Sequence, residues 1–194
     1  MKHILTLSLL LAIATSVTAQ DSPYAKGTKL VGFAMNSSAT SYEAGGITQT
    51  SSNGTFGVQY GYFVMNGLVL GVDLNSVVST FETEGGASNS TVENTQGSLG
   101  LFAAYYIRIG EKHALYPEIR LYGGSAETTG GVSGDEEWEI SGGTLGLGYT
   151  YRMNPFVGFD VKLRAGSQTE KTVSTGDELE LGAAQFLLGF QIFL

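Results

Sequence analysis

The sequence predicts an all-β protein: an eight-stranded antiparallel up-and-down transmembrane β-barrel with short periplasmic turns and long extracellular loops. Three observations lead to this prediction. Eight segments alternate apolar with small or polar residues at a period of two, which indicates strands and excludes helices. Short turns and long polar stretches separate these segments in alternation. The chain has 28 glycines in 194 residues and only 14% charged residues, whereas soluble domains average about 7% glycine and about 25% charged residues.

The N-terminal residues predict an export signal. A short basic start precedes an apolar run over residues 4–14, and the small residues Val17 and Ala19 fit the two positions that signal peptidase reads. The run is too short to cross a bilayer as a helix, which takes about 20 apolar residues. We therefore expect a signal peptide over residues 1–19, cleaved after Ala19, and an outer membrane β-barrel domain over residues 20–194.

Each of the eight strands is identified by the apolar residues at every second position. Small and polar residues, glycine above all, occupy the positions between them. In chain order the alternating apolar positions are Val31, Phe33 and Met35; Phe56, Val58, Tyr60, Tyr62 and Val64; Leu68, Leu70, Val72 and Leu74; Leu99, Leu101, Ala103, Tyr105 and Ile107; Leu115, Ile119 and Leu121; Leu145, Leu147, Tyr149 and Tyr151; Val157, Phe159, Val161, Leu163 and Ala165; and Phe186, Leu188, Phe190, Ile192 and Leu194.

The connections predict the orientation of the barrel. Tight turns are expected at Met65-Asn66-Gly67, near residues 110–112 and at Met153-Asn154-Pro155. In bacterial outer membrane barrels the short turns face the periplasm, and an even number of strands returns the chain to the side where it began, so both termini are expected to be periplasmic. Long polar loops are expected near residues 37–54, 79–96, 127–141 and 167–180.

The alternation also predicts which face meets lipid. In a membrane barrel the apolar face points outward, and the small and polar face fills the interior. Eight strands leave an interior just wide enough for side chains to fill. Aromatic residues gather toward the short turns on the apolar face, where an interfacial girdle belongs; they are Tyr60, Tyr62, Tyr105, Tyr149, Tyr151 and Phe156.

Charged residues in the strands fall on the opposite face and are expected inside the barrel. A lone buried charge is very costly, so these residues must pair with one another or meet water. One interpretation is a network of ion pairs that plugs a closed barrel; the other is a narrow gated pore lined by the same side chains. The residues are Asp73, Glu118, Arg120, Arg152, Asp160, Lys162 and Arg164.

The long loops are acidic, and one stretch is a candidate cation site. Asp135, Glu136 and Glu137 could bind a divalent cation that bridges to lipopolysaccharide phosphates, although the spacing of an ordered calcium loop is absent. The alternative is that the acidic loops form only a hydrated surface that resists aggregation. No cofactor is expected.

Composition argues against catalysis and against nucleic-acid binding. The chain has two histidines, His3 and His113; the first leaves with the signal peptide and the second lies at a short turn. A Ser-His or Asp-His site in the extracellular half is therefore excluded. The absence of cysteine excludes a thiol nucleophile, and the net charge of −8 makes a general phosphate-binding surface improbable. We expect no enzyme and no nucleic-acid partner.

Two stretches resemble a known family. The run from Gly61 to Gly71, GYFVMNGLVLG, is similar to a strand-turn-strand segment of outer membrane β-barrel domain proteins of Bacteroidetes-like bacteria, and Lys26-Gly27-Thr28 before the first strand is also similar. The layout resembles the small OmpA/OmpX-type barrels. Such barrels end in an alternating strand that the assembly machinery recognises. Gly189-Phe190-Gln191-Ile192 fits that strand, whereas the terminal Leu194 departs from the usual aromatic residue.

These observations predict a non-enzymatic integral protein of the bacterial outer membrane. We expect a structural or surface-interaction role, with acidic loops outside and a charge-plugged interior. Its expected partners are outer membrane lipids, lipopolysaccharide and, during biogenesis, the barrel assembly machinery. Two alternatives stay open: a narrow passive channel for ions or small solutes, and a soluble lipocalin-like carrier, which is also eight-stranded.

Overall fold

The chain folds into one antiparallel sheet that closes on itself. The structure, a computed structural model, describes residues 22–44, 47–85, 89–130 and 136–194. Its strands are β1 (Lys29–Ala44), β2 (Ile47–Met65), β3 (Leu68–Glu84), β4 (Ser90–Tyr105), β5 (Ile107–Arg108), β6 (His113–Thr129), β7 (Glu136–Arg152), β8 (Val157–Thr172) and β9 (Glu178–Phe193). The expected signal peptide over residues 1–19 lies outside the described residues.

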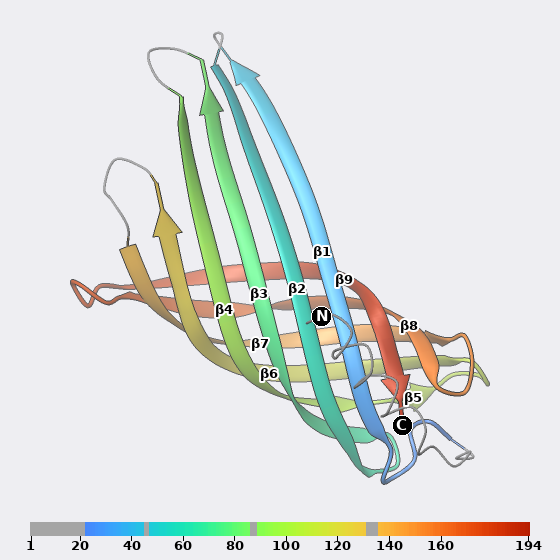
Figure 1. Ribbon diagram of the computed structural model, residues 1–194. Helices are drawn as coiled ribbons and strands as arrows, with labels where there is room; N and C mark the ends of the chain where they lie inside the picture. The colour runs from blue at the N-terminus through green and yellow to red at the C-terminus, as the bar shows by residue number, and fades with distance from the viewer. Residues whose placement is uncertain (1–21, 45–46, 86–88, 131–135) are drawn as a thin grey trace, which may run out of the picture.

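The sheet is an eight-stranded barrel, as predicted. Consecutive strands pair with each other, except β4 and β5, and β1 pairs with β9. The short β5 follows β4 after a single residue, and both pair with β6, so β4 and β5 form one crossing of the wall. Figure 1 shows the strongly tilted strands winding around a common interior. No helix in the described part of the chain is long and apolar enough to cross a membrane.

Three short turns gather at one end of the barrel, which we call the turn end. They join β2 to β3, β5 to β6 and β7 to β8. Gly67 in the first turn has φ of +84°, a left-handed conformation that glycine adopts without strain. Residues 22–28 lie against this end, where the Gly67 N–H donates to the Tyr24 carbonyl over 2.8 Å.

At the opposite end, which we call the long-strand end, most of the expected loops are strands. The polar stretches near 37–54, 79–96, 127–141 and 167–180 are largely ladder-paired extensions of the hairpins; β1 and β2, for example, pair in unbroken register from Lys29↔Tyr62 to Ala44↔Ile47. These stretches are rich in Ser and Thr, and Thr favours the extended backbone. The extensions lack the apolar alternation because only the membrane-spanning part must present one apolar face.

The seam between β1 and β9 is the shortest pairing between full-length strands. Their register runs only from Leu30↔Phe193 to Met35↔Leu188. Beyond Met35, β1 pairs with β2 alone in the described part of the chain, and Figure 1 shows β1 and β9 diverging above the seam. The wall is therefore continuous at the turn end and split along one line toward the long-strand end.

The outer surface is apolar and the interior is polar at mid-height. Leu70, Leu101, Leu121, Leu145 and Leu147 are 46–67% exposed on the outside. All the buried charged side chains of the described residues lie inside the barrel. This distribution overturns the lipocalin-like alternative, because a soluble carrier needs a polar exterior around an apolar interior.

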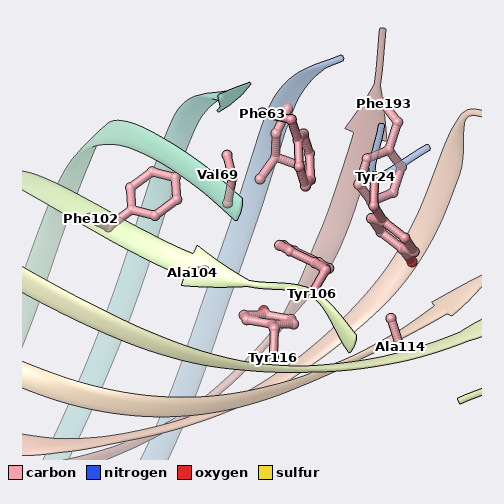
Figure 2. Close-up of a cluster of buried hydrophobic side chains, with 10 residues drawn as sticks. Tyr24, Phe63, Val69, Phe102, Ala104, Tyr106, Ala114, Tyr116 and Phe193 are labelled. Atoms are coloured by element: carbon pink, nitrogen blue, oxygen red, sulfur yellow. The ribbon is translucent and has the colours of Figure 1, made fainter. Parts of the chain in front are cut away.

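An aromatic cluster fills the interior at the turn end. Tyr24 enters from the segment before β1 and stacks on Tyr106, with ring centroids 4.9 Å apart, and Tyr106 stacks on Tyr116 at 4.4 Å. Phe193 meets Tyr24 edge-on at 5.3 Å. Figure 2 shows these rings side by side across the barrel, together with Phe63. The turn end is thereby closed by tightly packed side chains rather than by charge.

Candidate functional site: the barrel interior

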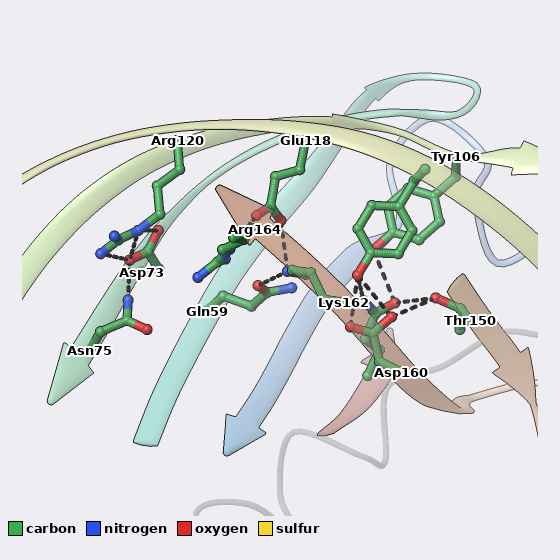
Figure 3. Close-up of polar contacts among 12 residues, drawn as sticks. Gln59, Asp73, Asn75, Tyr106, Glu118, Arg120, Thr150, Asp160, Lys162 and Arg164 are labelled. Atoms are coloured by element: carbon green, nitrogen blue, oxygen red, sulfur yellow. Dashed lines mark hydrogen bonds and ion pairs between the residues drawn. The ribbon is translucent and has the colours of Figure 1, made fainter. Parts of the chain in front are cut away.

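The interior holds three polar layers above the aromatic cluster, and Figure 3 shows them in sequence. The first is centred on the Asp160 carboxylate of β8. It accepts hydrogen bonds from the Tyr116 hydroxyl at 2.7 and 2.8 Å and from the Thr150 hydroxyl at 2.9 Å. No base lies within ion-pair distance of Asp160 in the described residues. Hydroxyl donors, rather than a cation partner, therefore hold this buried carboxylate.

The second layer joins β6 to β8 across the interior. Glu118 accepts from the Lys162 ammonium at 2.7 Å through Oε2, and from Arg164 at 2.8 Å through Oε1. Lys162 also donates to the Gln59 side-chain oxygen of β2 over 3.2 Å. The Glu118 and Lys162 side chains are each 1% exposed. One carboxylate thus serves two cations, and it uses both of its oxygens.

The third layer joins β3, β4 and β6. The Arg120 guanidinium donates to the Asp73 carboxylate through Nε and Nη2 at 2.8–3.0 Å, and Nη2 also donates to the Ser98 hydroxyl at 3.1 Å. The Asn75 side-chain amide donates to Asp73 from the same strand. Arg120 lies over the Tyr122 ring, 4.1 Å from its centroid, in a cation–π contact. This pair is therefore held on all sides.

The interior charges balance. In the described part of the chain the buried ionisable side chains with charge are three carboxylates and three bases, listed as Asp73, Glu118 and Asp160 with Arg120, Lys162 and Arg164. Arg152, which alternation also placed inside, takes part in none of these ion pairs. It is half-buried at the turn end, and its guanidinium donates to the Glu111 carbonyl at 2.6 Å.

A cavity of about 260 Å³ lies beyond the third layer, toward the long-strand end. Its charged lining residues are Arg120 and Arg164 alone, and no carboxylate lines it. Eight other lining residues carry an amide or a hydroxyl group: Thr55, Asn75, Gln96, Ser98, Tyr122, Thr144, Gln168 and Gln185. Val77, Leu181 and Gly182 complete the wall. No residue of β1 contributes, because the cavity lies where β1 has turned away from β9.

The aromatic residues expected to form a girdle lie on the outside, around the turn end. Tyr60, Tyr62 and Tyr105 are 43–48% exposed, and Tyr151 and Phe156 are each 38% exposed. Tyr149 is half-buried, and its hydroxyl lies 2.6 Å from the His113 ring nitrogen Nδ1. Five of the six are therefore exposed on the outer face, and the sixth is half-buried.

Two of the three acidic residues considered as a cation site, Glu136 and Glu137, are described by the structure. Asp135 lies outside the described residues. Glu136 and Glu137 are consecutive in β7, so their side chains point to opposite faces of the sheet. Glu137 lies opposite Glu127 of β6. The described residues contain no group of three or more acidic or histidine side chains that could hold a metal.

Sequence reasoning missed the aromatic cluster and the neutral polar partners. Alternation puts Phe63 and Tyr116 on the interior face, but the small residues around them gave no indication that the two rings belong to an aromatic cluster. Tyr24 lies before the first alternating segment, so no periodicity marks it. Gln191 is 1% exposed and accepts a hydrogen bond from Tyr106 over 3.0 Å. No pattern in the sequence around Gln191 predicts this contact.

Comparison with solved structures finds the same fold. OprG, an outer membrane protein of Pseudomonas aeruginosa, matches with a TM-score of 0.51 and 16% identity, over 90% of this chain and 99% of that one. Ail of Yersinia pestis matches at 0.48 and 16%, over 87% and 99% of the two chains. Neisserial surface protein A matches at 0.47 and 16%, over 86% and 97%.

Comparisons of the sequence, by contrast, find no match. No family model matches the chain, and no curated protein matches it. At 16% identity the likeness to OprG shows the fold alone. The chain is therefore a small eight-stranded β-barrel of the outer membrane type, and its role must be argued from its own residues.

Proposed function

We propose that this protein is a closed, non-enzymatic barrel of the bacterial outer membrane with a structural or surface-interaction role. The observation that supports this proposal best is the filling of the interior at successive levels. The stacked rings of Tyr24, Tyr106 and Tyr116 close the turn end, and the pairs of Glu118 with Lys162 and of Asp73 with Arg120 lie above them. Such a barrel acts through its surfaces rather than through its lumen.

The proposed orientation puts the turn end in the periplasm and the long-strand end outside. The exposed Leu, Val and Phe side chains would face lipid, with the six aromatic residues of the girdle at the inner interface. Acidic side chains of the long-strand end, such as Glu82, Glu84 and Glu180, would then face lipopolysaccharide and the medium. Insertion would depend on the barrel assembly machinery.

Single cysteines offer a test of the orientation, because the chain has none of its own. Glu178→Cys at the long-strand end and Lys112→Cys at the turn end are both exposed positions. An impermeant maleimide added to intact cells should label the first and spare the second until the cells are broken. The reverse pattern would overturn the proposed orientation.

The absence of catalysis is proposed on geometric grounds. The one histidine of the described residues, His113, begins β6 at the turn end and lies against Tyr149. It would therefore be periplasmic and far from substrates in the outer leaflet. A Ser-His or Asp-His pair at the long-strand end has no histidine to use.

A narrow channel is the second candidate, favoured by one observation: the cavity of about 260 Å³ above Arg120 enters the interior from the long-strand end. Planar bilayer recordings distinguish the two. The closed barrel should show no steady conductance, and Arg120→Ala should also stay closed because the second layer and the aromatic cluster persist below it. Steady conductance of the unmodified protein that falls on Lys162→Gln substitution would refute the closed barrel and establish the channel.

A further inference from the structure

The cavity above Arg120 combines features of a ligand site. Two arginines and eight neutral hydrogen-bonding side chains line it, and its size is near the lower end of small-molecule pockets, which span about 300–1,000 Å³. We propose that it binds a small organic carboxylate with a polyhydroxylated body, such as a sugar acid. This inference goes beyond the structural role and holds whether or not the barrel conducts.

The two arginines present unused donors to the cavity. Asp73 engages Arg120 through Nε and Nη2, and Glu118 engages Arg164 through the same two nitrogens. Each Nη1 group therefore has no hydrogen-bond partner in the described part of the chain. The carboxylates hold the guanidiniums from behind, because neither Asp73 nor Glu118 lines the cavity. A guanidinium pre-oriented in this way suits a planar carboxylate.

A second, independent observation also points to a ligand. Thr144 lines the cavity, whereas its hydroxyl is shielded from solvent and has no hydrogen-bond partner; it is the one side-chain atom of this kind in the described residues. A buried polar atom without a partner costs free energy, and native structures usually satisfy it. A ligand hydroxyl or carboxylate would supply the missing bond once rotation about the Thr144 Cα–Cβ bond turns the hydroxyl into the cavity.

The remaining wall suits a hydroxylated body. Gln168 accepts hydrogen bonds from the Gln96 amide and from the Tyr122 hydroxyl, each at 3.0 Å, and donates to Glu170 at 2.8 Å. These bonds fix the three cavity-lining side chains relative to one another, so a ligand would meet a preset arrangement. The β1–β9 ladder ends at Met35, so no backbone pairing joins these two strands at the level of the cavity, and a ligand would enter there.

Isothermal titration of the protein, purified from outer membranes in detergent, tests the site with three probes: gluconate, glucose and inorganic phosphate. Gluconate should bind saturably, and glucose, which lacks the carboxylate, at least tenfold more weakly. Arg164→Gln should weaken gluconate binding at least tenfold. That change removes one of the two cationic partners of Glu118 and could destabilise the barrel. Electrophoresis of unboiled and boiled samples must therefore show a band that shifts on boiling, as evidence that the variant is folded.

Thr144→Val is a second variant, in which a loss of affinity could not be attributed to a loss of stability. It keeps the side-chain shape and removes an unpaired buried hydroxyl, so its urea midpoint should equal or exceed that of the unmodified protein while gluconate affinity falls about threefold. Thr169→Val, the same change on the outer face of β8, should leave affinity unchanged. The proposal is overturned by no saturable binding, by glucose or phosphate binding as tightly as gluconate, or by unchanged affinity in Thr144→Val.

Discussion

The Lys162 ammonium lies 2.7 Å from Glu118 Oε2, although the two residues belong to β8 and β6, which β7 separates in the wall. The pair crosses the interior rather than following the sheet. Glu118 also binds Arg164, and Lys162 also donates to Gln59. The two ends of the pair are therefore not equivalent, and this asymmetry leads to the first prediction.

Removing the acid should cost more than removing the base. Glu118→Gln leaves Lys162 and Arg164 as buried cations without a carboxylate, and breaking a buried pair costs about 3–5 kcal/mol. Lys162→Met should cost less, because Glu118 keeps Arg164. The double variant should lose less than the sum of the two single variants. Urea unfolding in micelles measures all four proteins, and additive losses would show that the two residues do not interact.

Arginine on the outer face of β7 should impair insertion according to depth. Leu147 is 56% exposed in the apolar band, so Leu147→Arg should destabilise the folded barrel by about 2–4 kcal/mol. Ser141, exposed on the same face of the same strand, lies six residues nearer the long-strand end. Ser141→Arg should cost at most about 1 kcal/mol. Equal losses in reversible folding into vesicles would mean that this face does not meet lipid.

The β1–β9 seam should be sensitive to a single methyl group. A Cβ added at Gly189 would lie 1.9 Å from the Phe33 carbonyl oxygen, so the two backbones could not keep their register. Gly189→Ala should destabilise the barrel by about 1–3 kcal/mol, the usual cost of overpacking. Gly182→Ala is the matched control on the same strand, because nothing lies within 4 Å of its added Cβ. Equal urea midpoints for the two variants would show that the seam is not close-packed.

High pH should release the segment that covers the turn end. Burial raises the pKa of Tyr24 to about 12 from 10.0, against the opposing charges of Arg152 and Arg108. A raised folded pKa means that docking is fully stable below pH 10 and weakens as the pH rises toward 12, because the released phenol ionises first. Proteinase K should therefore cleave residues 22–28 faster at pH 11 than at pH 9.

Tyr24→Phe is the control for this prediction. It keeps the ring that stacks on Tyr106 but has no ionisable hydroxyl, so its cleavage rate should not show the same rise at pH 11 once the activity of the protease is corrected for. A difference titration at 295 nm between the two proteins should give one phenol that ionises near pH 12. A midpoint near 10 would mean that Tyr24 is not buried in solution.

The sequence by itself determined the strands, their alternation and the identity of the two faces. A strand has a strict period of two, so local residues alone put Leu70 and Leu147 outside and Glu118 and Lys162 inside. The same logic placed Arg152 inside as well, where it is half-buried at the end of β7 and takes part in no interior ion pair. The alternation rule also predicted loops at the Ser- and Thr-rich ends of the hairpins. These stretches are strands without an apolar face, because they lie beyond the membrane-spanning part.

Counting from the preceding turns puts Glu118 and Lys162 at similar depth inside the barrel, so their contact could be predicted from the sequence. Only the tertiary structure decided the other partners, such as Gln59 for Lys162 and Ser98 for Arg120, because these depend on the registers of several strands and on the curvature of the closed sheet. Closure also decided that Tyr24, which lies outside every alternating segment, would stack on Tyr106, and that the β1–β9 pairing would end at Met35. Alternation determines the face of the sheet to which each side chain points, whereas packing in the closed barrel determines which residues it contacts.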